Sequence, residues 1–322
     1  MSNTFFFETH KTLLMPSLHQ VRTFLAVIDA GSVRAAAVRL VVSQPAVSAT
    51  LGALQREVGA SLFERDGRGL RLTEPGKVME LYGRRILALI DEGVAQTRAA
   101  ANAHGGRVRI AAVTTAAEQL LPELIQAFRE HEGSFEVELE VANRARVWEL
   151  LTHWDVELVL AGRPPQGEAF RTLATRPNEL VIVAQPGSGA RDIAALARET
   201  WLLREPGSGT RTTTEEFFAQ LGIDPERLTI GSNGAIRECV RWGLGLSLLA
   251  RDAIERELAE GLLEIVPTPE TPLVRAWHVV ASAERELSPT ALRFVDHLCT
   301  RGGFTVPGLT AAKRARVSAR RA

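Results

Sequence analysis

Cysteine and long apolar runs are the features in shortest supply in this sequence. Cys239 and Cys299 are its only cysteines, and they form neither a C-x-x-C pair nor a spacing typical of metal ligands. This excludes a disulfide framework and a zinc scaffold, and we expect reduced thiols in a cytoplasmic protein. No run of about 20 apolar residues is present to cross a membrane. Phe5-Phe6-Phe7 is too short for the core of a signal peptide.

The sequence also lacks the motifs that carry enzyme chemistry. It has no H-E-x-x-H, G-x-S-x-G or G-x-x-x-x-G-K-[ST] segment, and its seven histidines are scattered. The glycines at 187–189 and 207–209 lack the strand and helix of a dinucleotide site. His19, His153 and His278 are expected on the surface or in packing roles. We therefore expect no enzyme activity, no cofactor and no metal ion.

Net charge is absent overall but not locally. The 322 residues carry 38 basic and 38 acidic side chains, so no global basic field indicates nucleic acid. Residues 16–77, by contrast, hold eight Arg or Lys against five Asp or Glu, a net charge of +3. The length and the 45% hydrophobic content suffice for two or three domains with substantial cores. The local charge gives modest support for DNA binding near the N-terminus.

Residues 33–73 have the pattern of a winged helix-turn-helix, and an amphipathic helix over Leu18–Ala30 is expected to buttress it. Ser43 is a good N-cap, and Pro45 lies in the first turn, where its missing N–H costs nothing. The second helix should run to about residue 54, and outward amide and small side chains near its start can read base edges. Residues 65–73 predict a two-stranded wing that turns on glycine and meets phosphates. The expected inward face is Ala46, Val47, Leu51 and Leu54. The expected DNA contacts are Ser32, Arg34, Ser43, Gln44, Pro45, Ser48, Thr50, Arg65, Arg68, Arg71 and Thr73.

The same stretch resembles the LysR-type transcriptional regulators. The shared pattern is Gly31-Ser32-x-x-x-Ala36-Ala37-x-x-Leu40-x-x-Ser43-Gln44-Pro45-Ala46-Val47-Ser48, then Leu54, Gly59, Leu62-Phe63-Glu64-Arg65 and Leu72-Thr73-x-x-Gly76. Many relatives carry Arg or other polar groups where this chain has Ala49, Gly52 and Ala53, and Gln55 replaces the usual Glu. The recognition helix is therefore poor in base-reading cations. The resemblance implies double-stranded DNA as a partner.

A long amphipathic helix is predicted after the wing, from about residue 75 to residue 102, with a glycine-marked hinge at 103–106. A helix about 40 Å long with a single apolar seam is not stable unpaired in water. In the resembling family this helix pairs antiparallel with that of a second subunit; a linker packed only on its own chain is the alternative. The expected dimerisation residues are Met79, Tyr82, Ile86, Leu89, Ile90 and Val94.

From residue 107 onward strands and helices alternate, which predicts an α/β domain with a parallel sheet. Strands are expected over 108–113, 135–141, 156–160, 180–184, 201–203, 228–231, 246–249 and 274–281, and helices over 118–131, 144–152, 210–221, 233–242, 251–260 and 289–300. The resembling family has a two-lobed, periplasmic-binding-protein-like effector domain here. The expected division is therefore a winged helix-turn-helix at 16–74, a linker helix and hinge at 75–104, and an effector domain at 107–302. Its lobes are about 107–183 with 282–302, and about 184–281. Residues 1–15 are expected to be a disordered extension, or to precede a true start at Met15, and residues 303–322 a basic disordered tail.

Ligands of open α/β sheets bind at the carboxyl ends of strands, next to helix N-termini that attract anions. Five such ends carry hydroxyl, amide or guanidinium groups that would converge on one inter-lobe cleft. The expected effector contacts are Thr114, Thr115, Arg144, Gly162, Arg163, Ser208, Thr210, Arg211, Ser232 and Asn233. The stretches 204–211 and 231–236 resemble the subgroup of LysR-type regulators that control carbon fixation and sulfur assimilation. That resemblance implies a small anionic effector, although Arg211 could instead be a surface ion-pair residue.

These observations predict a cytoplasmic, ligand-responsive transcriptional regulator that acts as a homodimer or homotetramer, with RNA polymerase as a further candidate partner. A solute-binding or sensor protein of the same two-lobed fold, without a transcriptional role, is the alternative. It would need an export signal and would not need a helix-turn-helix. A DNA-architectural protein without an effector is a third alternative. It is disfavoured because the α/β domain would then have no function.

Overall fold

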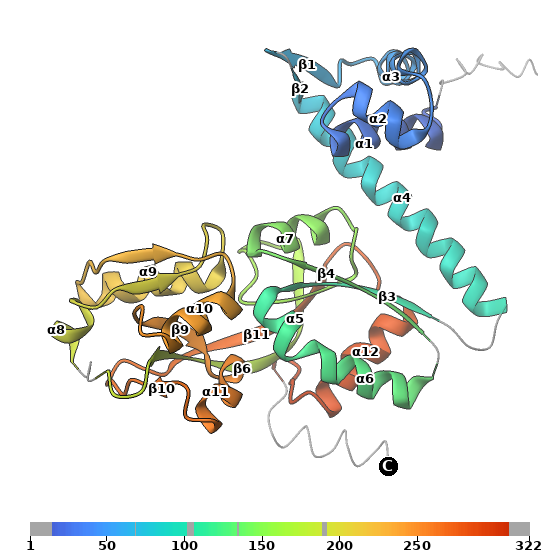
Figure 1. Ribbon diagram of the computed structural model, residues 1–322. Coiled ribbons are helices and arrows are strands. Elements are labelled where there is room, and N and C mark those ends of the chain that lie inside the picture. The colour runs from blue at the N-terminus through green and yellow to red at the C-terminus, as the bar shows by residue number, and fades with distance from the viewer. Residues whose placement is uncertain (1–14, 68, 102–105, 134, 189–191, 309–322) are drawn as a thin grey trace, which may run out of the picture. The chain divides into compact units, whose positions relative to one another are not determined.

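The computed structural model describes residues 15–67, 69–101, 106–133, 135–188 and 192–308 (Figure 1). The chain divides into two compact units, Met1–Val94 and Ala95–Ala322. Most of the expected N-terminal extension and hinge, residues 309–322 of the expected tail and Arg68 lie outside the described residues. The tail was predicted to start too early at 303, because Phe304 is 2% exposed in the core and Thr305 pairs with Thr175. Among the described helices none is by itself long and apolar enough to cross a membrane, although the bent pair Val33–Leu40 and Gln44–Val58 passes that test of length and composition.

The N-terminal unit is a winged helix-turn-helix, as predicted. It contains α1 (Leu18–Ala30), α2 (Val33–Leu40), α3 (Gln44–Val58) and an antiparallel wing of β1 (Phe63–Asp66) and β2 (Gly69–Leu72). Ser17, Ser32 and Ser43 cap the three helices through their side chains. Phe24, Leu54 and Leu62 are completely buried where the helices meet. The caps fix where each helix begins, and the apolar stripes fix which face turns inward.

Two expectations for α3 need correction. The helix continues past residue 54 to Val58 and ends on Gly59, whose φ of 74° is the left-handed conformation that glycine adopts freely. Ala46 is exposed, whereas Val47, Leu51 and Leu54 are buried as expected. Ala46 lies one position, or about 100° around the helix, from Val47, so its side chain turns away from the core that Val47 enters.

The linker helix α4 (Glu74–Ala101) begins directly after the wing. Thr73 Oγ1 accepts a hydrogen bond from the Gly76 N–H at 3.0 Å and donates one to the Ser61 carbonyl at 2.6 Å. Gly76 is required at this junction, because a Cβ there would lie 2.1 Å from the Leu62 carbonyl oxygen. The start of α4 is thereby fastened to the winged-helix core.

The second unit begins with a parallel α/β lobe. Its elements are β3 (Arg107–Val113), α5 (Thr114–Gln119), α6 (Leu121–Glu132), β4 (Glu136–Ala142), α7 (Arg144–Thr152) and β5 (Leu158–Ala161). The strand β3 pairs in parallel with both β4 and β5. The helix expected over 118–131 is in fact two helices, α5 and α6. Phe128 of α6 and Phe294 of α12 (Pro289–Thr300) pack on one face of the sheet, and α7 packs on the other.

The second lobe is built around two long antiparallel strands, β6 (Phe170–Ala184) and β11 (Leu273–Ser282). Both strands continue the sheet of the first lobe, in the order β10-β6-β11-β5-β3-β4, with β9 also on β6. The remaining elements are α8 (Ile193–Leu196), β7 (Trp201–Leu203), α9 (Gly209–Leu221), β8 (Arg227–Thr229), α10 (Asn233–Arg241), β9 (Ser247–Ala250), η1 (Arg251–Ala253), α11 (Glu255–Ala259) and β10 (Glu264–Ile265).

Three sequence-based expectations are wrong here. The strand expected over 180–184 begins ten residues earlier, at Phe170, and the helix expected over 251–260 is divided into η1 and α11. The sheet is not uniformly parallel, because β9, β10 and β11 all pair antiparallel with β6. Polar and charged residues at 171–179 hid the first part of β6, since only its last five residues are buried without interruption.

Candidate DNA-binding surface and effector cleft

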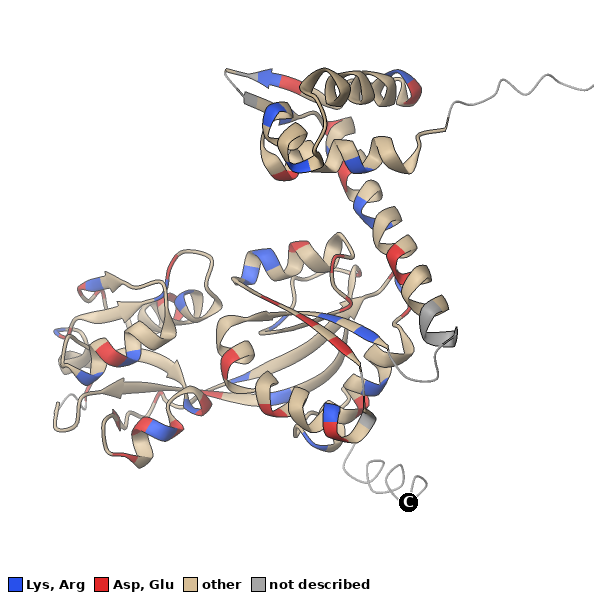
Figure 2. Cartoon of the chain, turned by 45° about the vertical axis from the view of Figure 1, so that its right-hand side comes forward, with Lys and Arg blue, Asp and Glu red and all other residues tan. Residues whose placement is uncertain are grey.

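The N-terminal half of α3 presents an almost uncharged surface. Gln44, Pro45 and Ser48 are exposed on it, and Figure 2 shows charged residues only at the far end of this helix. Ser43 is exposed as well, but its hydroxyl accepts the Ala46 N–H at 3.3 Å. Thr50 is half-buried, and its hydroxyl donates to the Ala46 carbonyl at 2.9 Å. The hydroxyls of Ser43 and Thr50 are therefore already hydrogen-bonded to the backbone of α3.

The cations around α3 differ in how far they are already paired. Arg34 and Arg65 are exposed, whereas Arg71 forms an ion pair with Glu64 across the wing at 2.6 Å. Ser32 is exposed and caps α2 through the Ala35 N–H at 3.1 Å. Thr73, another expected DNA contact, uses its hydroxyl both as a donor and as an acceptor at the junction between the wing and α4.

An apolar seam runs along the exposed side of α4. Tyr82, Ile86, Leu89 and Val94 are between 42% and 57% exposed on it, and Val78, which the sequence prediction omitted, is 57% exposed. The prediction for Met79 is wrong, because Met79 packs against the winged-helix core of its own chain. Ile90 is only half-buried. The seam defined by residues 78, 82, 86, 89 and 94 is unpartnered among the described residues.

A cleft of about 730 Å³ lies within the second unit, between the first turns of α5, α7 and α9 and the strands β6 and β11. Seven of the ten expected effector contacts line it: Thr114, Thr115, Arg144, Gly162, Arg163, Ser208 and Thr210. They come from the carboxyl ends of β3, β4 and β5 and from the start of α9. The convergence that the strand-end rule predicted is therefore present.

Three expected contacts do not line the cleft. Arg211 donates to Glu215 at 2.8 Å, to the Arg204 carbonyl at 3.1 Å and to Thr229 at 3.2 Å, so it is the ion-pair residue of the alternative interpretation. Ser232 caps α10 through the Ala235 N–H. Asn233 is 3% exposed and lies behind the cleft, where it binds two residues that do line it.

Sequence reasoning missed several cleft residues that come from strand interiors, from the loop after β7 or from the next turn of α9: Asn178, Arg204, Glu205, Thr212, Thr213, Glu216, Arg275, Trp277 and His278. Arg204 directly follows β7, so the strand-end rule contained the signal for it. The residues of β6 and β11 gave no such signal, because they line the cleft from the middle of the two strands that cross between the lobes.

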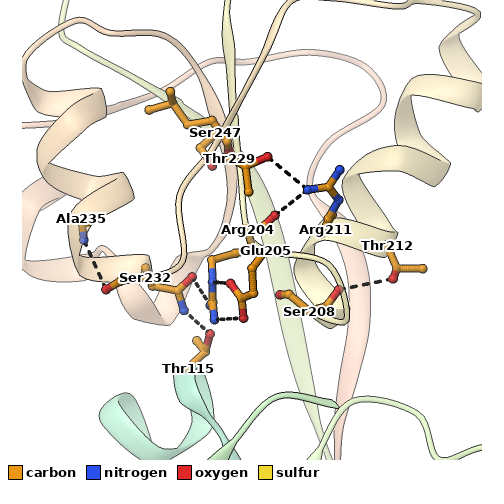
Figure 3. Close-up of polar contacts among 12 residues, drawn as sticks. Thr115, Arg204, Glu205, Ser208, Arg211, Thr212, Thr229, Ser232, Ala235 and Ser247 are labelled. Carbon is orange, nitrogen blue, oxygen red and sulfur yellow. Dashed lines mark hydrogen bonds and ion pairs between the residues drawn. The ribbon is translucent and has the colours of Figure 1, made fainter. Parts of the chain in front are cut away.

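Arg204 organises the base of the cleft (Figure 3). Its Nε and Nη2 donate to the two carboxylate oxygens of Glu205 at 2.7 and 3.0 Å, and its Nη1 donates to Asn233 Oδ1 at 2.7 Å. Asn233 Nδ2 in turn donates to Thr115 Oγ1 at 2.6 Å. This chain of hydrogen bonds joins α10 of one lobe to α5 of the other.

The cleft is electropositive. Four arginines line it, Arg144, Arg163, Arg204 and Arg275, against two carboxylates, Glu205 and Glu216, which leaves a net charge of +2. Burial lowers the pKa of Arg144, and Glu216 partly offsets this. The pKa of His278 is lowered, mainly by burial and further by the charges of Arg163 and Arg144. Its imidazole is therefore neutral near pH 7. The cleft therefore favours an anion.

Polar atoms that face no protein partner also indicate a polar ligand. Asn178 Oδ1, Trp277 Nε1 and His278 Nδ1 are buried without a hydrogen-bond partner among the described residues, and all three residues line the cleft. Buried polar groups are normally hydrogen-bonded. At the opposite wall, Ser208 begins α9 without a side-chain cap, which leaves first-turn N–H groups for a ligand. The described residues contain no group of three or more His, Cys, Asp or Glu placed to hold a metal ion.

Comparison with known proteins agrees with both parts of the molecule. Residues 18–77 match the model of the bacterial regulatory helix-turn-helix protein, lysR family, and residues 101–302 match the LysR substrate binding domain. The chain is 36% identical over 284 residues to the RuBisCO operon transcriptional regulator of Allochromatium vinosum, covering 86% of this chain and 94% of that protein. It is 34% identical over 285 residues to the transcriptional regulator CbbR of Rhodospirillum rubrum, covering 87% and 95%.

Solved structures show the same architecture. The regulatory domain of Synechocystis CcmR, in complex with 2-PG, is 31% identical with a TM-score of 0.56, over 61% of this chain and 96% of that one. Full-length CbnR with its target DNA shares the fold, with a TM-score of 0.63 at 23% identity over 88% and 99%. The helix-turn-helix match favours a regulator over a solute-binding protein. This chain belongs to the LysR family of bacterial transcriptional regulators and is a DNA-binding regulator with an effector-binding domain.

Proposed function

We propose that this regulator controls genes of carbon fixation in response to a small phosphorylated carboxylate that binds between its two lobes. The observation that carries the proposal is the cleft itself, with its net charge of +2 and the open first turn of α9. Free N–H groups at a helix N-terminus bind phosphate well. The relatives named for the RuBisCO operon, and CcmR with its 2-PG, support both the regulated genes and the ligand class.

DNA recognition in this proposal divides between α3 and the wing. Gln44, Pro45 and Ser48 form the exposed surface of α3 that enters the major groove, where the Gln44 amide can form two hydrogen bonds with an adenine. Arg34 and Arg65 contact phosphates and set the register. Arg71 contributes less, because Glu64 already balances its charge.

Dimerisation in this proposal uses the seam on α4. Five apolar side chains at helical spacing are exposed on one side of a helix of 28 residues. A second copy of the same helix, packed antiparallel, would cover this seam and pair two DNA-binding heads. Two such dimers would form a homotetramer. The DNA-bound form would then contact RNA polymerase. Because its target is DNA, we place the protein in the cytoplasm, and we assign it no enzymatic reaction.

Effector binding changes DNA binding only through different affinities for different lobe arrangements. The cleft contains groups from both lobes, so an anion that bridges Arg144 in one lobe and the start of α9 in the other favours a closed arrangement. The altered lobes then bias the paired reading heads toward one spacing on DNA.

The experiment is calorimetric titration of the full chain with 2-phosphoglycolate, with glycolate and glycerol as controls that lack the phosphoryl group or all charge. Binding of 2-phosphoglycolate with much weaker binding of both controls is expected. A gel-shift titration on the DNA flanking the protein's own gene, with and without 2-phosphoglycolate, then checks regulation. Tighter binding of glycerol than of either anion would refute the anionic effector.

A further inference from the structure

Glu205 forms a bidentate ion pair with the Nε and Nη2 groups of the Arg204 guanidinium. Its carboxylate accepts from Nε at 2.7 Å and from Nη2 at 3.0 Å. Arginine binds a carboxylate or phosphate ligand through the same pair of donors. The Arg204 side chain is 6% exposed and that of Glu205 31% exposed, so a solute in the cleft meets Glu205 first (Figure 3). An internal carboxylate therefore takes the place that an effector anion would take.

Asn233 keeps the guanidinium in place independently of Glu205. Arginine has only donors, so the bond from Arg204 Nη1 requires the oxygen of the Asn233 amide at that position. The amide nitrogen then faces Thr115 and donates to its hydroxyl. With Nη1 anchored in this way, Nε and Nη2 still point toward the cleft when Glu205 leaves.

Glu205 is charged at neutral pH. Burial by itself raises the pKa of its carboxyl, but hydrogen bonds from Arg204 and the backbone, with the charge of Arg204, outweigh this effect and hold the pKa below its ordinary value. Arg204 and Glu205 are adjacent in the sequence, so their ion pair can open without the movement of a distant segment.

We propose that Glu205 is the resident occupant of an anion subsite on Arg204, and that the anionic group of an effector binds there by displacing it. This rests on the proposed function of the cleft. The apparent affinity for any anion is then lowered by the fraction of molecules in which Glu205 covers the subsite. Glu205 sets the effector concentration to which the regulator responds.

The matched control is Glu216, the second carboxylate of the cleft. Its ion-pair partner is Arg275 at 3.6 Å, so Glu216→Gln removes the same charge without uncovering Arg204. The probe is inorganic phosphate, titrated against the full chain by calorimetry and by thermal shift. Glu205→Gln is expected to bind phosphate about tenfold more tightly than the wild type, and Glu216→Gln about twofold. Equal gains in the two variants, or no gain in Glu205→Gln, would overturn the proposal.

Two further variants locate the effect. Arg204→Met in the Glu205→Gln background should abolish the gain, and a gain that persists would place the anion elsewhere. Glu205→Asp keeps the charge but shortens the side chain, so a smaller gain is expected; this variant decides the question if Glu205→Gln does not fold by circular dichroism. Failure of 2-phosphoglycolate to bind the wild type would refute the proposed effector class, while the phosphate comparison would still decide the role of Glu205.

Discussion

Asn233 Nδ2 donates a 2.6 Å hydrogen bond to Thr115 Oγ1, and this bond joins α10 to α5 across the base of the cleft. Both residues are buried, at 3% and 8% exposure, so neither group can turn to water. The Asn233 amide also holds Arg204, so one side chain connects the two lobes to the electropositive part of the site.

Thr115→Val should destabilise the effector domain, because it leaves the buried Asn233 amide without an acceptor. The expected loss is about 1–3 kcal/mol in the free energy of unfolding. Urea unfolding measures it, with Thr114→Val as the control on a half-buried neighbour in the same cleft. A loss no larger than that of the control would mean that the hydrogen bond contributes little.

Gln44→Ala should weaken binding to the operator more than binding to random DNA. A bidentate contact between an amide and an adenine accounts for about 1–3 kcal/mol of discrimination. Fluorescence anisotropy with both DNA molecules at one salt concentration measures the difference. Equal losses on the two DNAs would remove Gln44 from the residues that read bases.

Arg65→Ala should weaken binding to both DNAs and reduce the slope of log affinity against log salt by about one unit, because one phosphate contact is lost. Arg71→Ala is the matched control on the other strand of the wing, and its pair with Glu64 predicts a smaller change. Measurements over a range of salt concentrations compare the two slopes. A larger effect from Arg71 would reverse the assignment.

Ile86→Glu should dissociate the dimer before it affects the fold of either unit, because it places two unpaired charges in the paired seam. An unpaired buried charge costs roughly 3–5 kcal/mol. Light scattering measures the mass of the full chain. Met79→Ala is the control, since Met79 packs on its own core and should lower thermal stability while the mass stays dimeric. An unchanged mass for Ile86→Glu would contradict the seam as the interface.

His278 should make the protein less stable as the pH falls. Its folded pKa lies below its ordinary value of 6.5 because of burial and the charges of Arg163 and Arg144. Between the folded and unfolded pKa the unfolded chain binds more protons, so stability rises with pH in that window and is lost on acidification through about 6.5. The urea midpoint of unfolding is measured at pH 7.5 and at pH 5.5. Its decrease between the two should be smaller for His278→Gln than for the wild type. Bound phosphate should lessen the wild-type loss, because an anion favours the imidazolium.

The sequence by itself determined the local elements. Apolar spacing placed α1, Ser43 and Pro45 placed the start of α3, and the expected bounds of α7, β7 and α12 agree with the structure residue for residue. These features depend on contacts within a few positions along the chain, which the sequence displays directly. The strand-end rule likewise located seven cleft residues, because parallel strands place their carboxyl ends at one edge.

Only the tertiary structure decided what depends on contacts between distant segments. Met79 belongs to the core rather than the seam because the winged helix covers one side of α4. Arg211 donates hydrogen bonds to Glu215 and Thr229, whereas Arg204 lines the cleft and donates to Glu205. Residues of β6 and β11 line the site because those strands cross between the lobes. The strand-end rule points to Arg204, but its bond to Asn233 and that of Arg211 to Thr229 join positions 29 and 18 residues apart, which only folding brings together.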